Sequence, residues 1–251
     1  MERNGRLDRG DGIELAWRML PGREPTVTFL HGFRSDMMSD KADALAALSA
    51  ARGQAMLRFD CSGHGASGGD FADGTIGRWR DDALAVLDAI APGPLLLVGS
   101  SMGGWLALLV ALARRPRVRA LVGIAAAADF TETLMWQAMT QDERATLMRD
   151  GRLIVPSAYG EPYPLTRALI EEGRRHLLLA APIRLACPVR LLHGQRDADV
   201  PWETALRLAE RIEGTDVQVT LVKDGEHRLS RPQDLALLGR TVGALLGEDG
   251  A

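Results

Sequence analysis

Residues 99–103 read Gly-Ser-Ser-Met-Gly and place a serine between two glycines. The short apolar run Leu95–Val98 precedes this segment as a buried strand would, and Trp105–Ala113 follows it with the pattern of a buried helix. A G-x-S-x-G segment between a strand and a helix is typical of a sharp turn that exposes its central serine as a nucleophile. We therefore predict that Ser101 is a nucleophile. The alternative is a plain Gly/Ser turn that joins two core elements.

A serine hydroxyl becomes a good nucleophile when a base takes its proton and a third group orients that base. In the fold that carries such turns, the acid and the histidine follow the serine along the chain. The five histidines stand at positions 31, 64, 176, 193 and 227. Two precede Ser101, the third lies in a helical insertion, and His193 ends a predicted strand. His227 alone lies in a loop after the last predicted strand, and we predict it as the base. A surface histidine without function is the alternative.

The predicted acid lies in the loop after the preceding strand, where Asp197 and Asp199 are both available. Asp197 lies three residues after Gly194 in a G-x-x-D-x-x-V-P arrangement, so we prefer it. Asp199 is interpreted as a helix-capping or solvated residue near Trp202. Two acids two residues apart leave Asp199 as the alternative acid.

Acyl transfer also needs two hydrogen-bond donors for the oxyanion that forms during the reaction. One predicted donor is the backbone N–H of Met102, the residue after the serine. The other is the backbone N–H of Phe33, in the segment His31-Gly32-Phe33 that follows an early predicted strand. Gly32 permits a close approach of the backbone there, and His31 is interpreted as structural.

Composition and motifs exclude several other classes of protein. The chain of 251 residues is 46% hydrophobic with a formal net charge of −3, so nothing favours nucleic acid or an anionic membrane as a partner. No glycine-rich phosphate-binding motif follows a strand, and no spacing of histidine or cysteine fits a metal site, so we expect neither cofactor nor metal. No apolar stretch is long enough to span a membrane.

Cysteine usage and the N-terminal residues bear on the compartment. The two cysteines, Cys61 and Cys187, suggest no disulfide scaffold and fit a reducing compartment. Residues 1–8 have no apolar core, so no signal peptide is expected. These observations predict a cytoplasmic protein.

Short apolar runs alternate with helical patterns along most of the chain, which is typical of a mostly parallel, doubly wound sheet with helices on both faces. We predict one such α/β domain over residues 1–251. Asp40 and Thr75 are predicted N-caps of two helices. The predicted strands are Ile13–Met19, Thr26–Leu30, Gln54–Phe59, Leu95–Val98, Ala120–Ile124, Val189–Leu192 and Val217–Val222. The predicted helices are Asp40–Ala51, Ile76–Ile90, Trp105–Ala113, Trp202–Ile212 and Gln233–Leu246.

The alternation of strands and helices breaks between about residues 129 and 182. Here Phe130–Arg149 and Leu165–Leu179 look helical, and the irregular segment 154–160 joins them. Because roughly fifty residues bury too little apolar surface to stand alone, we predict a small helical cap over one end of the sheet rather than a second domain.

The first predicted helix of this cap carries large flexible or aromatic side chains that suit an irregular acyl chain. We predict that they line an acyl pocket over Ser101, and packing of the cap on the sheet is the alternative reading of the same spacing. The side chains are those of Leu134, Met135, Trp136 and Met139.

With Ser101, Asp197 and His227 placed, the chain resembles the α/β-hydrolase superfamily along essentially its whole length. The closer resemblance is to the group of the mitochondrial palmitoyl-protein thioesterase that also acts as an acyl-glucuronide esterase. The chain departs from that group in having no Arg-rich, acid-poor transit segment, and in carrying His31 where animal members have proline. The resemblance rests on the segments Arg58–Gly63, Gly77–Asp82, Gly99–Leu106, Cys187–Gly194, Val200–Trp202 and Asp224–Arg228.

The residues and the resemblance together predict a serine hydrolase that cleaves acyl thioesters or carboxylic esters through an acyl-enzyme. The partner implied is a small-molecule or lipid-derived acyl ester or thioester, or an acylated protein. An aminopeptidase or a carbon–carbon bond hydrolase is the alternative on the same fold, and a non-catalytic ligand-binding protein is the alternative from another class. A dehalogenase is disfavoured because it would need aspartate in place of Ser101.

Overall fold

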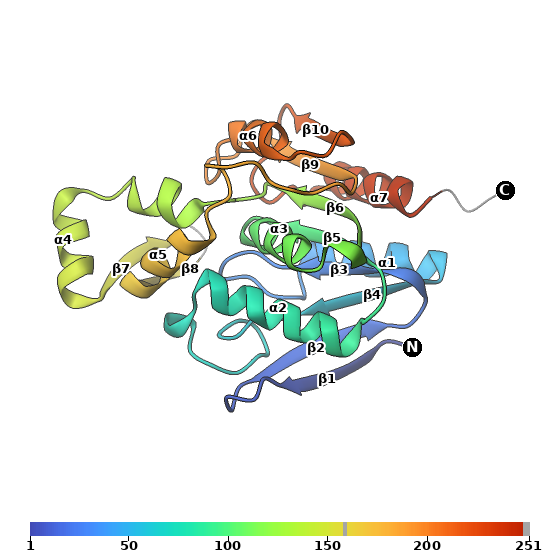
Figure 1. The fold of residues 1–251 in the computed structure, drawn as a ribbon, viewed down its shortest axis with the longest axis horizontal. Coiled ribbons are helices and arrows are strands. Elements are labelled where there is room, and N and C mark those ends of the chain that lie inside the picture. Colours follow the sequence, from blue (N-terminus) through green and yellow to red (C-terminus); the bar gives the residue numbers. More distant parts are fainter. Residues whose placement is uncertain (158–159, 248–251) are drawn as a thin grey trace.

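An eight-stranded sheet forms the centre of the computed structural model, which describes residues 1–157 and 160–247 (Figure 1). Its strands are β1 (Arg3–Asp8), β2 (Glu14–Leu20), β3 (Arg23–Leu30), β4 (Gln54–Phe59), β5 (Leu95–Ser100), β6 (Val118–Ile124), β9 (Val189–Gly194) and β10 (Val217–Val222). Their order across the sheet is β1-β2-β4-β3-β5-β6-β9-β10, antiparallel at β1 and β2 and parallel from β4 to β10. The predicted mostly parallel sheet is confirmed.

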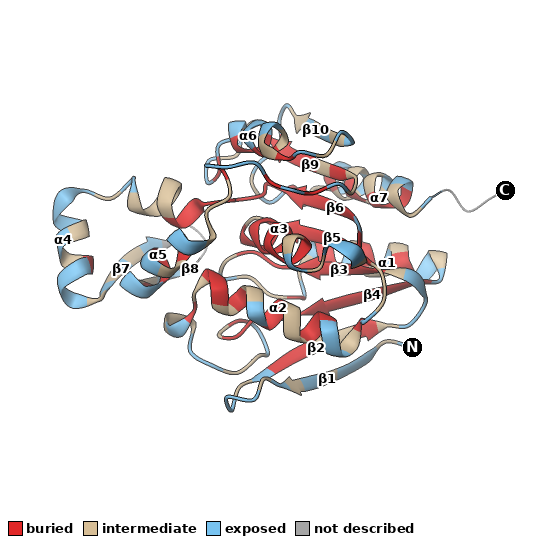
Figure 2. Ribbon diagram, viewed as in Figure 1, coloured by how far each residue is buried: buried red, intermediate tan, exposed pale blue. Residues whose placement is uncertain are grey.

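Helices cover both faces of the sheet, and buried residues concentrate along the strands between them (Figure 2). Helices α1 and α7 pack on one face, while α2, α3 and α6 pack on the other. The helices are α1 (Asp40–Arg52), α2 (Ile76–Ile90), α3 (Met102–Ala113), α6 (Glu203–Arg211) and α7 (Pro232–Leu246). Thr75 caps α2, as predicted, by accepting the N–H of Arg78 at 3.2 Å. The predicted cap at Asp40 is wrong by one residue, because Ser39 is the N-cap of α1.

The continuous apolar run of β5 serves both layers of helices. Side chains of a strand alternate between its two faces, so Leu95 and Leu97 join the cluster under α2 and α3. Leu96 and Val98 join the cluster under α1 and α7. A strand buried on both faces needs apolar residues at every position, and this requirement explains the uninterrupted run before Ser101.

Between β6 and β9 the chain leaves the sheet and forms the cap. Its elements are the π-helix η3 (Thr131–Trp136), α4 (Gln141–Asp150), β7 (Arg152–Ser157), β8 (Gly160–Thr166), α5 (Arg167–Gly173) and the 3₁₀ turn η4 (Arg174–His176). Figure 1 shows this group projecting to one side of the sheet. Asp129, at the start of the cap, accepts the backbone N–H groups of Leu178 and Leu179 at 2.8 and 2.9 Å. One buried carboxylate thereby joins the two ends of the cap.

The internal structure of the cap differs from the prediction. The single helix expected over Phe130–Arg149 is broken, because the side chain of Thr140 begins α4 in a capping box with Glu143. The segment expected to be irregular forms an antiparallel hairpin of β7 and β8, and Leu165 lies in β8 rather than in a helix. Residues 158 and 159 of that segment lie outside the described residues. Pro156 and Pro164 disguise the hairpin, since proline within a short run argues against a strand.

The edge strand β1 was also absent from the prediction. Its sequence Arg-Asn-Gly-Arg-Leu-Asp carries no apolar pattern, and its structure depends on antiparallel pairing with β2. Local sequence cannot reveal a strand whose stabilisation comes from its partner. Within the described part of the chain, no helix combines the length and apolar composition that crossing a membrane requires.

Candidate active site

Ser101 lies at the sharp turn between β5 and α3, with φ 55° and ψ −118°. This left-handed backbone conformation is strained for a residue with a side chain and is typical of functional turns. The neighbouring glycines are required sterically: a Cβ on Gly99 would overlap the carbonyl oxygen of Gly103, and a Cβ on Gly103 would overlap that of Leu30. The second overlap shows that α3 begins directly against the end of β3.

Three side chains form a continuous hydrogen-bonded chain that starts at this turn. The Nε2 atom of His227 lies 3.1 Å from the Oγ of Ser101, and its Nδ1 lies 2.8 Å from the Oδ2 of Asp197. Ser101 follows β5, Asp197 follows β9, and His227 follows β10. Since these strands are parallel, their carboxyl ends lie at one edge of the sheet and bring the three residues together.

The surroundings of Asp197 distinguish it from Asp199. The Asp197 side chain is fully buried, and its Oδ1 accepts the backbone N–H groups of Asp199 and Val200 at 2.9 and 2.8 Å. Burial acts to raise the pKa of this carboxyl, but hydrogen bonds from His193 and His227 and the charge of His227 outweigh it and leave the pKa below its usual range. Asp199 is exposed and lines the cavity beside Ser101.

The loop after β3, which carries the predicted donor Phe33, lies close to Ser101, and the other predicted donor, Met102, follows Ser101 in the chain. A Cβ built on Gly32 would lie 3.4 Å from the Cβ of Ser101 and 4.0 Å from its Oγ, so the loop after β3 passes directly beside the nucleophile. Within the described residues, neither the N–H of Phe33 nor that of Met102 donates a hydrogen bond to another protein group. Met102 is the first residue of α3, where backbone N–H groups have no partner within the helix.

Two buried histidines hold the backbone of residues 31–34, the loop after β3 that we call the predicted oxyanion loop. The Nε2 of His64 accepts the N–H of Arg34 at 3.2 Å, next to the predicted donor Phe33. The Nε2 of His31 accepts the N–H of Cys61 at 3.1 Å and so joins the loop to the end of β4. Burial, and then the neighbouring His31, lower the pKa of His64 to about 3. Both rings act as neutral acceptors, and the structural interpretation of His31 agrees with its contacts.

The predicted oxyanion loop is also attached to the cap. The ring of Phe33 makes edge contacts with Phe130 and Tyr163 of the cap, with ring centroids 5.6 and 5.5 Å apart. The guanidinium of Arg34 lies 4.7 Å from the centre of the Tyr163 ring and donates to the carbonyl oxygen of Glu161 at 2.8 Å. A displacement of the β7–β8 hairpin therefore acts directly on the segment that carries Phe33.

Lys41 attaches the His227 loop to α1, a contact that the sequence analysis did not predict. Its Nζ donates to the carbonyl oxygen of Arg228, the residue after His227, and lies 3.4 Å from the Oγ of Ser230. Burial lowers the pKa of Lys41 to about 8. Lysine is unfavourable in the first turn of a helix, where the dipole favours acids, and this mismatch is the signal that could have identified it.

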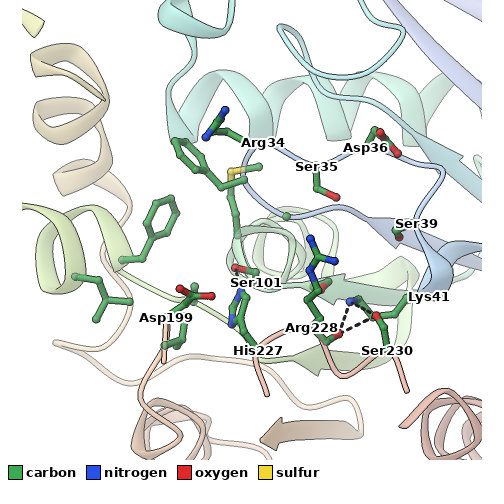
Figure 3. Close-up of a pocket in the computed structure, with 18 of the residues that line it drawn as sticks. Arg34, Ser35, Asp36, Ser39, Lys41, Ser101, Asp199, His227, Arg228 and Ser230 are labelled. Atoms are coloured by element: carbon green, nitrogen blue, oxygen red, sulfur yellow. Dashed lines mark hydrogen bonds between the residues drawn. The ribbon is translucent and has the colours of Figure 1, made fainter. Parts of the chain in front are cut away.

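Ser101 and His227 line a cavity of about 750 Å³ together with both polar and apolar side chains. Figure 3 shows Ser39, Lys41 and Ser230 on one side of the pair, with Arg228 directed into the space between. Apolar side chains, mostly from the cap, also line the cavity: Phe130, Leu134, Met135, Pro156, Tyr163 and Val200.

The predicted acyl-pocket residues separate into two pairs. Leu134 and Met135 line the cavity, but Trp136 and Met139 do not. Trp136 instead lies between the guanidinium groups of Arg144 and Arg174, which are 5.1 and 4.7 Å from its ring. The prediction of Trp136 and Met139 as pocket residues is therefore corrected. Because η3 is a π-helix rather than an α-helix, the expected 3.6-residue spacing does not describe which side chains share a face.

One cluster among the described residues has the geometry of a metal site. Single ligand atoms of Asp197, Asp199 and His227 lie within 4.8 Å of one another. Two of these residues already form the chain of hydrogen bonds to Ser101, and a bound cation would compete for the imidazole that contacts the serine.

Comparison with known proteins identifies the family. The Alpha/beta hydrolase family matches residues 29–237. The chain belongs to this family. It is 41% identical over 242 residues to mouse "Palmitoyl-protein thioesterase ABHD10, mitochondrial", covering 96% of this chain and 81% of that protein. Human ABHD10 gives the same identity over 79% of its length.

Solved structures agree with this family. Mouse alpha/beta hydrolase domain-containing protein 10 superposes with a TM-score of 0.91 at 40% identity, covering 99% of this chain and all of the other. A putative hydrolase from Agrobacterium vitis S4 superposes with a TM-score of 0.92 at 42% identity, with 98% of each chain covered. The predicted family, the fold class and an esterase- or thioesterase-type hydrolase are confirmed.

The predicted cytoplasmic location is wrong. The curated relatives from mouse, orangutan and human are all named as mitochondrial proteins, which points to mitochondria rather than the cytoplasm. The prediction depended partly on two free cysteines, and a low cysteine count fits any reducing compartment equally well.

The buried His64 generates a prediction about acid stability. Its pKa is about 3 in the folded chain and about 6.5 when exposed, so between these values the unfolded chain binds a proton that the folded chain does not. Its contribution to stability is complete above pH 6.5 and is lost as the pH falls toward 3. We expect this residue to lower the free energy of unfolding by up to about 1.4 kcal/mol for each unit by which the pH falls within that window.

Urea unfolding between pH 4.5 and 7.5 measures the effect. The variant His64→Gln can accept the Arg34 N–H through its side-chain oxygen but does not titrate, so its stability should vary less steeply with pH than that of the wild type. Parallel curves for the two proteins would show that His64 does not contribute.

Proposed function

We propose that this protein is a serine hydrolase that cleaves acyl thioesters or carboxylic esters through an acyl-enzyme. Ser101 is the nucleophile, His227 the base and Asp197 the acid of the triad. The observation that carries the proposal is the continuous contact from the strained Ser101 turn to a buried carboxylate, at 3.1 and 2.8 Å. These distances lie within the range in which a base can take the hydroxyl proton.

In the first half of the reaction the Oγ of Ser101 attacks the substrate carbonyl carbon and its proton passes to the Nε2 of His227. The carbonyl oxygen becomes an oxyanion, which the N–H groups of Phe33 and Met102 stabilise. Asp197 stays ionised, fixes the imidazole orientation through Nδ1 and stabilises the imidazolium. As the tetrahedral intermediate collapses, the bond to the leaving thiol or alcohol breaks and His227 returns the proton to it.

In the second half, water replaces the leaving group. His227 takes a proton from the water as its oxygen attacks the acyl carbon of the Ser101 ester, and the same two N–H groups stabilise the second oxyanion. Collapse breaks the ester bond, His227 returns the proton to Oγ, and the carboxylic acid leaves. The catalyst is restored without a net gain or loss of protons.

The cavity supports a division of the substrate into two parts. Its apolar lining residues, among them Phe130, Leu134 and Met135, suit an acyl chain, and its polar lining residues, among them Lys41 and Ser230, suit a hydrophilic leaving group. The relatives are named as palmitoyl-protein thioesterases, which agrees with a long acyl chain on a polar partner. We propose acyl thioesters, including those of acylated proteins, as the first substrates to test.

A fluorophosphonate probe combined with a hydrolysis panel tests the proposal. The panel holds acyl thioesters, p-nitrophenyl esters, acyl glucuronides and aminoacyl amides, ranked by kcat/KM. Ser101→Ala should abolish labelling and lower kcat by roughly 10⁴–10⁶-fold on the best substrate. Ser100→Ala is the matched control and should keep both the labelling and the wild-type kcat. Labelling that persists in Ser101→Ala would reject the nucleophile, and absence of labelling and turnover in the wild type would favour a binding protein.

The two neighbouring acids generate a second prediction. Asp197→Asn presents an amide to Nδ1 and favours the wrong imidazole tautomer, so we expect kcat to fall by roughly 10³–10⁴-fold. Asp199→Asn leaves the backbone N–H that Asp197 accepts and should retain most activity. Steady-state kinetics on folded variants decides between them, and the reverse ranking would move the acid to Asp199.

The apolar lining of the cavity generates a third prediction. Met135→Ala removes a lining side chain, so kcat/KM should fall more for medium and long acyl chains than for acetyl, by about 0.8 kcal/mol for each methylene that loses its contact. Met139 lies on the same cap segment outside the cavity, and Met139→Ala should keep the chain-length profile. An equal loss at all chain lengths in Met135→Ala would assign this residue to packing alone.

A further inference from the structure

A second histidine contacts the buried acid of the proposed triad. His193 ends β9, four residues before Asp197, and its side chain is fully buried. Its Nε2 lies 3.1 Å from the Oδ2 of Asp197 and 3.0 Å from the carbonyl oxygen of Val200. The Oδ2 of Asp197 is the same atom that contacts His227, so one carboxylate oxygen is shared by two imidazole rings.

These contacts assign the tautomer of His193. Both neighbours of Nε2 are acceptors, so Nε2 carries the ring proton and donates it to both. The Nδ1 atom is buried without a hydrogen-bond partner among the described residues. A second ring proton, on Nδ1, would have no acceptor. Of the two histidines that contact Asp197, only His227 also contacts the Ser101 hydroxyl and is partly exposed to the cavity.

The unpartnered Nδ1 indicates that packing is not the reason for a histidine here. A buried polar atom without a partner destabilises a protein, and an apolar side chain of similar size would avoid that cost. The Nε2–H group is therefore the part of His193 that the site uses.

The hydrogen bonds of Asp197 show what the donor does. Two backbone N–H groups hold Oδ1, while Oδ2 is held by His193 and faces His227. With only its Oδ1 contacts the carboxylate could turn about its terminal torsion, which is a soft rotation. The His193 donor fixes the remaining oxygen in line with the Nδ1 of His227.

We propose that His193 is a positioning residue of the triad. It orients the Asp197 carboxylate, so that the negative charge of this carboxylate is shared between hydrogen bonds to His193 and to His227. The inference rests on the proposed function. It predicts that the donor at Nε2, rather than the imidazole ring, is what turnover requires. Among the described residues, two further titratable side chains lie close to Asp197. They are those of His227, from the loop after β10, and Asp199, from the same loop as Asp197.

Two substitutions separate the donor from the ring. His193→Gln can place its amide nitrogen near the position of Nε2 and keep a donor, whereas His193→Met has similar length and no donor. For His193→Met we expect kcat to fall roughly 10–100-fold with KM within about twofold of wild type, as for loss of a hydrogen bond to a charged group. His193→Gln should recover most of that loss.

The pH profile of kcat/KM gives a readout that a packing role would not move. Without the His193 donor the charge of Oδ2 acts on His227 alone and favours its imidazolium form, so the acid limb should move to higher pH in His193→Met and return in His193→Gln. Leu192→Met, a buried neighbour on β9, is the control for packing and should keep the wild-type profile.

The outcomes are separable from failure of the proposed function. A wild type without fluorophosphonate labelling or turnover rejects the function itself. An active wild type with a His193→Met variant that is folded, equally active and unchanged in pH profile overturns the inference. If kcat falls equally in His193→Gln and His193→Met, and the acid limb of the kcat/KM profile does not shift, His193 has a packing role. If His193→Met does not fold, the profile of His193→Thr, which also lacks a donor at the Nε2 position, decides the question.

Discussion

The close approach of α3 to the end of β3 is the constraint on which the site depends. It requires glycine at position 103, where a Cβ would overlap the carbonyl oxygen of Leu30. The sharp turn from β5 into α3 requires glycine at position 99, where a Cβ would overlap the carbonyl oxygen of Gly103. The same turn forces Ser101 into a left-handed conformation and leaves the Met102 N–H at the start of a helix without an intrahelical partner. The positions of Ser101, the Met102 N–H and the neighbouring Gly32 loop are thereby set by backbone geometry rather than by side-chain contacts.

Buried histidines support this backbone arrangement without carrying charge into the core. His64 accepts the N–H of Arg34 in the loop after β3, His31 in that loop accepts the N–H of Cys61 after β4, and burial lowers the pKa of each histidine. Charge is instead concentrated on Asp197, whose four hydrogen bonds keep it ionised under the imidazole of His227. Neutral acceptors thus hold the loop after β3, an ionised carboxylate contacts His227, and burial disfavours a cationic imidazole at His31 and His64.

The cap lines the cavity beside Ser101 and also contacts the loop after β3. Leu134 and Met135 are among its residues that line the cavity. Phe33 and Arg34 contact Tyr163 and the Glu161 backbone, so the β7–β8 hairpin and the predicted oxyanion loop form one packed unit. A displacement of the hairpin would therefore also move the backbone at Phe33 and Arg34.

The sequence by itself determined the mostly parallel sheet and the turn at Ser101, because these depend on local apolar runs and glycine spacing. It predicted Asp197 and His227 from the chain order expected for that fold, and the structure places both in contact with each other beside Ser101. The tertiary structure alone decided that β1 pairs as an edge strand, that the cap contains a hairpin, and that Trp136 stacks between arginines instead of lining the cavity. It also brought Lys41 to the His227 loop and His193 to Asp197. Lys41 and the His227 loop lie far apart in sequence, and Trp136 lies in a helix of unusual period. The edge strand, the hairpin and the contact of His193 with Asp197 join neighbouring segments through backbone pairing or loop conformation, which leaves no periodic apolar pattern in the chain.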